Sequence, residues 1–173
     1  MKTKQKIEEF LKQYNINNYT INDDLSVDVD GDVNLSEQNF EELPVNFGKV
    51  TGYFYCESCP NLITLEGAPK EMGKNLWCCS CINLISLKGF PKEIVGYFGC
   101  YKCSQLSSLQ YAPLKCKIDN FKDDILKGTN INTIEADKYL LKRILLGDFS
   151  LIKEYSNKNK IKPLLTMRDF DLI

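Results

Sequence analysis

Histidine is absent from this chain of 173 residues. The imidazole side chain is the commonest general base in enzymes and the commonest metal ligand, so its absence removes the most frequent route to either chemistry. The sequence also contains no glycine-rich phosphate loop and no Gly-x-Ser-x-Gly nucleophile motif. A cysteine nucleophile would need a neighbouring base or cation to form a thiolate, and no such base is evident. We therefore expect no catalytic residues and no enzymatic activity.

Long hydrophobic segments are absent as well. No apolar run approaches the about 18 residues that a membrane-spanning helix needs. The lysine-rich N-terminus leads directly into an amphipathic stretch, without the apolar segment of a secretory signal. The net charge of -1 provides no overall basic field that would attract nucleic acid. We therefore expect a cytoplasmic, monomeric protein that contacts neither a membrane nor, directly, nucleic acid.

Three copies of one pattern, spaced 22 residues apart, occupy the middle of the chain. Each copy reads Cys-x-x-Cys-x-x-Leu-x-x-Leu, and the copies begin at Cys56, Cys78 and Cys100. Proline follows each copy at the same offset, at Pro69, Pro91 and Pro113. A fixed period of about 20–29 residues with these leucines predicts a solenoid of leucine-rich type. Solenoids of this kind usually bind other molecules.

The segment from about Val33 to Pro113 resembles the leucine-rich-repeat superfamily. The residues that stand where this family places its strand and ladder positions are Val95, Phe98, Cys100, Cys103 and Leu106. The repeats are most similar to short, degenerate ones in proteins of bacterial viruses and mobile elements, of the form GYFxCxxCxxLxxLxGxPKE. Small proteins of that origin are often inhibitors of host defence, such as anti-CRISPR proteins. The resemblance thus implies a protein that acts in the cytoplasm of a bacterial host.

The flanks of the repeats predict helices and a hairpin. Residues 3–14 place Ile7, Phe10, Leu11 and Tyr14 on one face of an amphipathic helix. Apolar residues alternate over 25–29 and again over 33–35, with Asp30-Gly31 between them, which predicts a β-hairpin. After residue 113, a capping box at 132–135 and an apolar stripe predict a helix, and a second helix is expected over 148–155.

These signals together predict an α/β fold in three parts. Residues 1–32 form an N-terminal cap of helix and β-hairpin, residues 33–113 form the leucine-rich-repeat solenoid, and residues 114–173 form a helical C-terminal cap. Caps are expected because each coil hides its apolar face against its neighbours, so both ends of a stack need covering.

The eight cysteines permit two interpretations. Two CxxC pairs separated by 18 residues are also typical of a zinc ribbon. However, coils about 4.8 Å apart would arrange equivalent cysteines in columns, which do not bring four sulfurs to about 2.3 Å from one metal ion. Free cysteine also packs as a small hydrophobic residue. We therefore interpret the cysteines as core and expect neither metal nor cofactor, with a zinc-dependent nucleic-acid-binding module as the alternative.

The strands of the repeats offer the clearest candidate binding surface. Side chains alternate along a strand, so residues beside the inward Phe54 and Cys56 should point outward. These outward positions in the three copies hold Tyr53, Tyr55, Glu57, Asn75, Trp77, Cys79, Tyr97, Gly99 and Tyr101. Tyrosine and tryptophan are enriched at interface hot spots, which favours a partner-binding face. Alternatively, another segment covers this face, or β-propensity alone selects the aromatics.

An acidic run is the second candidate surface. Eight acidic residues lie between Asp23 and Glu42, without one lysine or arginine. Such a run is often a solvated surface. The alternative is a docking surface for a basic partner, for instance the nucleic-acid channel of a nuclease, because complementary charge speeds and orients association. Its contact residues would be Asp28, Asp30, Asp32 and Glu37.

The sequence therefore predicts a protein-binding repeat module. The most specific hypothesis is an inhibitor from a phage or mobile element that acts on a host defence complex, such as a CRISPR effector ribonuclease. The alternatives are the zinc-dependent nucleic-acid-binding module and a structural repeat protein with no inhibitory role.

Overall fold

The structure is a computed structural model that describes residues 3–91, 93–117, 125–131, 136, 138–140, 142–143 and 146–147. The chain divides into two compact units, Met1–Ile131 and Asn132–Ile173. The first unit contains the repeats and all of the strands found among the described residues.

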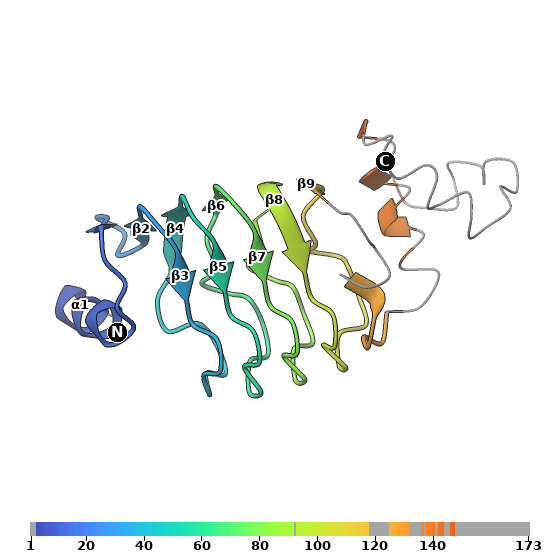
Figure 1. Ribbon diagram of the computed structural model, residues 1–173, viewed down its shortest axis with the longest axis horizontal. Coiled ribbons are helices and arrows are strands. Elements are labelled where there is room, and N and C mark those ends of the chain that lie inside the picture. Colours follow the sequence, from blue (N-terminus) through green and yellow to red (C-terminus); the bar gives the residue numbers. More distant parts are fainter. Residues whose placement is uncertain are drawn as a thin grey trace, which may run out of the picture. The chain divides into compact units, whose positions relative to one another are not determined.

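One helix precedes a row of short strands in the first unit (Figure 1). The helix, α1, spans Lys4–Gln13. The strands are β1 (Tyr19–Ile21), β2 (Val27–Val29), β3 (Val33–Asn34), β4 (Phe47–Val50), β5 (Phe54–Tyr55), β6 (Glu71–Met72), β7 (Leu76–Trp77), β8 (Glu93–Gly99) and β9 (Lys115–Lys117). They form a 4-stranded sheet in the order β1-β2-β4-β6 and a 5-stranded sheet in the order β3-β5-β7-β8-β9. The β1–β2 pair is antiparallel, and the other paired strands are parallel.

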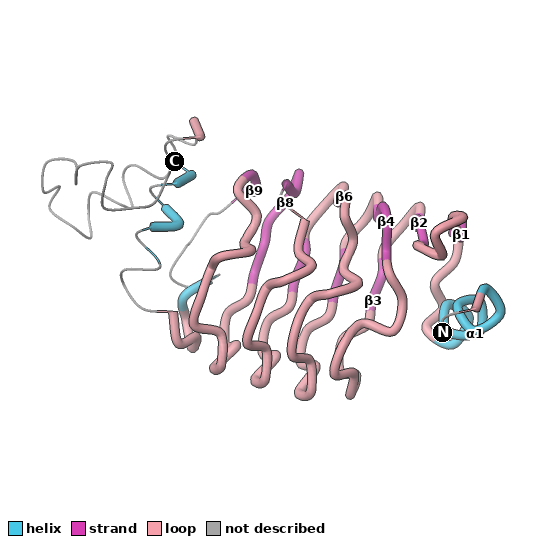
Figure 2. The backbone as a smooth tube through the Cα atoms, turned by 180° about the vertical axis from the view of Figure 1, so that it is seen from behind, coloured by secondary structure: helices cyan, strands magenta, loops and turns pink. Residues whose placement is uncertain are grey.

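The strands belong to a solenoid of about four turns. The first three turns each contribute one strand to each sheet, and the fourth contributes the longer β8. Phe54 pairs with Leu76, and Leu76 pairs with Phe98, so the register of the strands equals the repeat of 22 residues. Seen from behind, successive coils follow similar paths (Figure 2). The prediction of a repeat solenoid is therefore confirmed.

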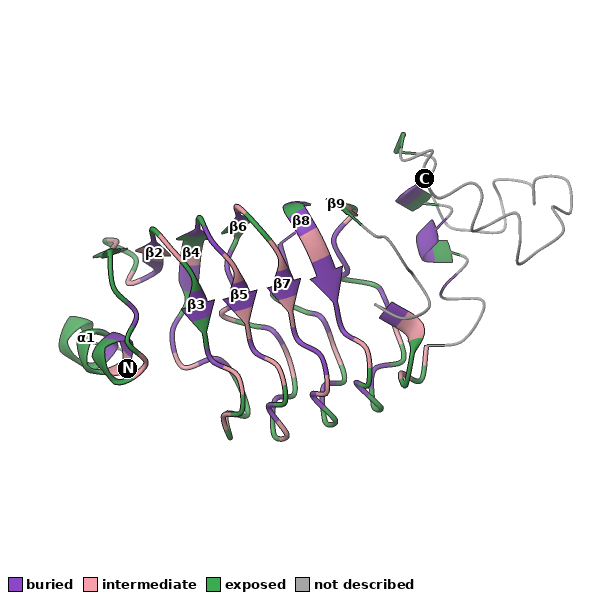
Figure 3. Cartoon of the chain, viewed as in Figure 1, coloured by how far each residue is buried: buried purple, intermediate pink, exposed green. Residues whose placement is uncertain are grey.

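The repeated apolar residues form the interior of the coils. Phe54, Leu76 and Phe98 each expose at most 1% of their surface. The leucines of the pattern are also buried, at Leu62, Leu65, Leu84, Leu87, Leu106 and Leu109. Burial therefore recurs at the same places from coil to coil (Figure 3), because each repeat presents the same apolar side chains to its neighbours. Between Val33 and Lys117 the described residues form strands, turns and loops, without a helix.

Left-handed backbone conformations turn the chain at fixed places in the coils. One such place holds a non-glycine residue in four successive coils, with φ between 54° and 63°, at Glu37, Ser58, Ser80 and Lys102. Another holds Gly89, whose φ is 97°. A Cβ atom at Gly89 would overlap the carbonyl oxygen of Leu65 in the preceding coil. Close approach and positive φ together explain why glycine precedes the repeat proline here.

The N-terminal helix is confirmed, with Thr3 as its N-cap and its side chain accepting a hydrogen bond from the Lys6 amide. Ile7 and Leu11 are buried, as the predicted apolar face requires. The rings of Phe10 and Tyr14 pack on Phe40, with centroids 6.1 Å and 5.8 Å apart.

The β-hairpin predicted over 25–35 is wrong. Both predicted strands exist, as β2 and β3, but they lie in different sheets, and each pairs with the next coil. Asp30 and Gly31 lie at the corner between the two strands. Val29 and Val33, on either side of this corner, are both buried in the core. The antiparallel partner of β2 is instead β1, which the sequence pattern did not reveal.

The helical C-terminal part is observed only in pieces. Residues 115–117 form β9, which pairs with β8, so strand pairing continues into the first residues of the segment that was predicted to be a helical C-terminal cap. In the second unit, residues 136, 138–140 and 142–143 are helical. Arg143 is buried there and donates a hydrogen bond of 3.2 Å to the Tyr139 hydroxyl. The predicted capping box at 132–135 and the helix over 148–155 lie outside the described residues.

Candidate binding face

The parallel register of the second sheet arranges the predicted outward side chains in columns. Tyr55 pairs with Trp77, and Trp77 pairs with Gly99 of the next coil. The five aromatic residues predicted to line this surface are all half-buried, and together we call them the aromatic face: Tyr53, Tyr55, Trp77, Tyr97 and Tyr101. Side chains at the strand positions between them, such as Phe54 and Phe98, are buried. The alternation expected from the sequence thus places the aromatic rings on the side of the sheet away from the core.

The indole of Trp77 lies against the neighbouring coil, where Gly99 has no side chain to occupy the same space. A Cβ atom at Gly99 would overlap Cε3 and Cζ3 of the Trp77 ring. Glycine at this position therefore leaves room for the indole beside the backbone of the next coil. Because the ring is half-buried, Trp77 joins the sheet surface rather than the core.

The tyrosines of the face are packed against one another and against lysines. The rings of Tyr53 and Tyr55 are stacked, with centroids 5.8 Å apart. The ammonium group of Lys74 lies 4.7 Å from the centroid of the Tyr53 ring, which is within the range of a cation–π contact. Burial raises the pKa of Tyr55, with smaller contributions from the nearby Tyr53 and Asp32.

Two more lysines accompany the tyrosines of the later coils. The ammonium group of Lys102 lies 5.9 Å from the centroid of Tyr101, and that of Lys117 lies 6.0 Å from the centroid of Tyr97. The sequence pattern does not reveal the contacts of these three lysines with the tyrosines. One signal was present for Lys74, because it takes the place that Gly52 and Gly96 hold 22 residues before and after it.

Asn75 has a structural role. Its Oδ1 accepts a hydrogen bond of 3.0 Å from the backbone amide of Tyr97 in the next coil. Asp32 does the same two coils earlier, with Oδ1 accepting a hydrogen bond of 2.9 Å from the backbone amide of Tyr53. These acceptors satisfy donors at a corner of the coil where strand pairing does not. Glu57, the remaining predicted contact residue on this sheet, is half-buried.

Some carboxylates of the acidic run accept hydrogen bonds from the next coil. Oδ1 of Asp28 accepts 2.8 Å from the backbone amide of Lys49, and Oδ1 of Asp30 accepts 2.8 Å from the Thr51 hydroxyl. Asp28 lies in β2 of the first sheet, whereas Asp32 directly precedes β3 of the second. Glu37 is exposed, at a left-handed turn position. Three of the four predicted docking carboxylates thus have a structural contact in addition to any contact with a partner.

The cysteines form buried columns, as predicted. Seven of the eight are buried and all eight are free thiols. The second cysteine of each pattern donates to a carbonyl oxygen of the preceding coil: Cys59 to Leu35 at 3.2 Å, Cys81 to Cys56 at 3.0 Å and Cys103 to Cys78 at 3.1 Å. Among the described residues, no group of three or more histidine, cysteine or acidic side chains could hold a metal ion.

Burial raises the pKa of the Cys56 and Cys100 thiols well above the usual value. A hydrogen bond with Cys103, together with burial, does the same for Cys78. The neutral thiols of Cys56, Cys78 and Cys100 are poor metal ligands and poor nucleophiles, since both roles need the thiolate, whereas hydrogen bonds with neighbouring cysteines lower the pKa of Cys103. The prediction that Cys79 points to solvent is wrong, because only 1% of this residue is exposed. Its sulfur lies close to Gly99 of the following coil.

No helix in the described part of the chain has the length and apolar character that crossing a membrane requires. Comparison of the chain with protein-family models, with curated proteins and with solved structures found no match.

Proposed function

We propose that this protein is a binding module whose aromatic face engages a protein partner. The observation that carries the proposal is the half-buried Trp77 on the surface of the sheet, whose strand neighbours are Tyr55 on the preceding coil and Gly99 on the next. Tryptophan and tyrosine supply most of the binding free energy at many interfaces, and such residues cluster near the interface centre. Their rings are already packed, so little conformational entropy is lost when a partner binds.

The scaffold in this proposal is a solenoid of leucine-rich type with covered ends. The packing of Phe10 and Tyr14 on Phe40, and the burial of Ile7 and Leu11, support a capping role for α1 at the first coil. A covered end would leave the sheet surfaces as the faces available to a partner.

The partner class is a hypothesis that rests on the resemblance of the repeats to those of phage and mobile-element proteins. In this hypothesis the protein acts as a monomer in the cytoplasm of a bacterial host. There it inhibits a host defence complex, for example a CRISPR effector ribonuclease.

Affinity capture from a bacterial lysate with the wild-type chain, followed by titration of the purified partner, tests the proposal. Trp77→Ala should weaken the affinity roughly 30-fold, as loss of a hot spot of about 2 kcal/mol does. Ile85→Ala is the matched control, because this side chain is 54% exposed but lies in the loop between β7 and β8. If the partner binds Trp77→Ala and Ile85→Ala with the wild-type affinity, the aromatic face is not part of the interface. A structural repeat protein without an inhibitory role would yield no partner that depends on Trp77.

A further inference from the structure

The first sheet of the solenoid ends in an unpaired strand edge. β1 lies at one end of the order β1-β2-β4-β6, so only one of its edges pairs with another strand (Figure 2). Asn18 and Asn22, which flank β1, both form backbone hydrogen bonds with residues that flank β2. Because hydrogen-bonded positions alternate along an antiparallel strand, the N–H and C=O groups of Tyr19 and Ile21 point to the opposite edge. Among the described residues, no hydrogen bond uses these groups.

This edge lacks the usual protection. Proteins commonly protect edge strands with proline, charged side chains or a covering segment. β1 reads Tyr-Thr-Ile, which contains neither proline nor charge and favours the extended conformation. Tyr19 is 38% exposed, and Thr20 is exposed as well. β3 ends the second sheet in the same way but has only two residues, so β1 is the longer edge at this end of the solenoid.

A cavity of about 440 Å³ lies beside β1. Its lining comes from α1, from the segment that leads into β1 and from Tyr19. Ile16 contributes a buried apolar side chain, and Glu8, Glu9 and Lys12 contribute two carboxylates against one ammonium group. Residues opposite each other on paired strands share a face of the sheet. A residue opposite Tyr19 on an added strand would therefore direct its side chain toward this cavity.

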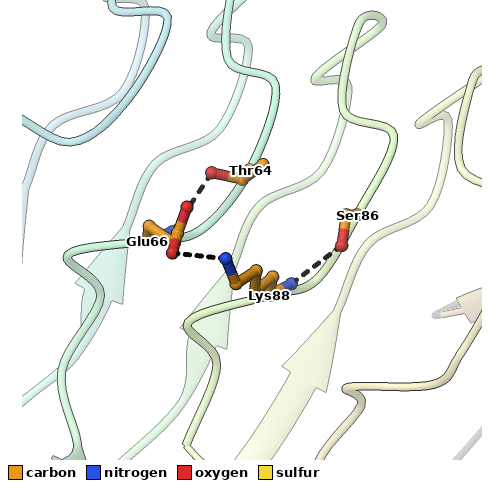
Figure 4. A network of polar contacts seen from close by, with 4 residues as sticks. All are labelled: Thr64, Glu66, Ser86 and Lys88. Atoms are coloured by element: carbon orange, nitrogen blue, oxygen red, sulfur yellow. Dashed lines mark hydrogen bonds and ion pairs between the residues drawn. The ribbon is translucent and has the colours of Figure 1, made fainter.

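Carboxylates dominate the charge around the edge. From residue 13 to residue 48 the chain contains eight acidic residues and no lysine or arginine, and two of them, Asp23 and Asp24, closely follow β1. Later coils differ, because lysines there neutralise acidic side chains, as Lys88 does for Glu66 at 2.9 Å (Figure 4). No ion pair is found among the described residues of α1 and the first coil. A basic ligand therefore complements this end of the solenoid.

We propose that the free edge of β1 binds an extended, basic segment of a protein partner as an added strand. Main-chain hydrogen bonds with Tyr19 and Ile21 hold the segment, and its side chains provide the specificity. A lysine or arginine opposite Tyr19 lays its aliphatic stem along the ring and Ile16. The charged end of that side chain then reaches Glu8 and Glu9. This site goes beyond the proposed function, because β1 belongs to the first sheet and the aromatic face to the second.

The charge favours a basic peptide over the other possible occupants. Antiparallel pairing of β1 with β1 of a second copy would place the acidic turn of each copy, at Asp23 and Asp24, beside the acidic cavity of the other. Like charges brought together in this way oppose association. The phosphate backbone of RNA or DNA would be repelled for the same reason.

Fluorescence anisotropy with a labelled octapeptide of alternating lysine and valine tests this inference on the full chain. The peptide should bind saturably, with an affinity that falls as salt rises. The matched control peptide has the same sequence but N-methylated valines, so that it keeps every charge and loses backbone donors. It should bind about tenfold more weakly, because an added strand needs those donors.

Two sets of variants locate the site. Glu8→Gln combined with Glu9→Gln should weaken binding about fivefold to tenfold. Glu41→Gln combined with Glu42→Gln removes the same charge from exposed positions of the first coil and should bind as the wild type does. Ile21→Pro removes an outward N–H group, at an edge position where proline is tolerated, and should weaken binding about tenfold or more.

Four results would overturn the inference. The first two are equal binding of the two peptides and equal losses in the two double variants. The third is a loss of peptide binding in Trp77→Ala, which would place the peptide on the aromatic face. The fourth is a dimer of the free chain in sedimentation that Ile21→Pro dissociates, which would assign the edge to a second copy. The proposed function is tested separately, by the affinity of Trp77→Ala for a purified partner.

Discussion

The indole of Trp77 lies on the α-carbon of Gly99, its neighbour in the next coil, so that one residue provides a ring and the other provides room for it. Gly99→Ala should destabilise the protein by about 1–3 kcal/mol, because the added methyl group overlaps Cε3 and Cζ3 of the ring. Denaturant unfolding of the variant measures the loss.

A double-mutant cycle identifies the cause of that loss. In the Trp77→Ala background the clash disappears, so the second change to alanine at Gly99 should cost much less than it does alone. If Gly99→Ala is equally harmful with and without the indole, backbone conformation rather than the ring determines the need for glycine.

The leucines of the central repeat are predicted to be the most sensitive core positions. Leu84→Ala and Leu87→Ala should each cost about 2–5 kcal/mol, because both side chains are at most 1% exposed and are packed between two coils. Ile85→Ala, at a 54% exposed position of the same loop, should change the free energy of unfolding by less than about 0.5 kcal/mol. Melting temperatures of Leu84→Ala or Leu87→Ala that match that of Ile85→Ala would contradict the packing.

Asp32 separates a structural from a docking role for the acidic run. Asp32→Ala removes the acceptor of the Tyr53 amide and should cost about 1 kcal/mol. Asp32→Asn keeps an oxygen acceptor and should retain most of the stability while removing the charge. A partner that binds the asparagine variant normally does not need the negative charge, whereas slower association at unchanged stability would support electrostatic docking.

The buried thiols predict loss of stability in alkaline solution. The pKa values of Cys56, Cys78 and Cys100 are raised in the folded protein, so these thiols keep their protons while those of the unfolded chain ionise above about pH 8.5. The folded state then binds more protons than the unfolded state, and each thiol lowers the free energy of unfolding by about 1.4 kcal/mol per pH unit. Stability should be constant from pH 6 to pH 8 with respect to these groups and should fall above that range.

Chemical denaturation between about pH 7 and pH 10 measures this slope. Cys100→Ala should flatten it by the share of one thiol, although the variant is less stable at neutral pH. An unchanged slope would mean that Cys100 titrates normally in the folded protein. Elemental analysis of the same samples should find no stoichiometric zinc, and one zinc ion per chain would restore the zinc-module hypothesis.

The sequence by itself determined the solenoid and its interior. The period of 22 residues equals the strand register from Phe54 to Leu76 to Phe98, and the repeated leucines and cysteines are buried. This was readable because every coil meets the same neighbours, so the same apolar residue recurs wherever the chain faces the core. The amphipathic helix could also be predicted, because the spacing of its apolar residues indicates that one helical face is buried.

Only the tertiary structure determined how the chain turns between β2 and β3 and which side chains of neighbouring coils are in contact. The apolar alternation of β2 and β3 looks like a hairpin, yet the corner at Asp30 sends the two strands into different sheets. Lys74 reaches Tyr53, 21 residues earlier, and Gly99 receives Trp77, 22 residues earlier. Contacts of this kind join residues whose types differ from coil to coil, so the repeat pattern of the sequence does not predict them. They follow from the stacking of coils, which places side chains from distant parts of the sequence within a few ångströms of one another.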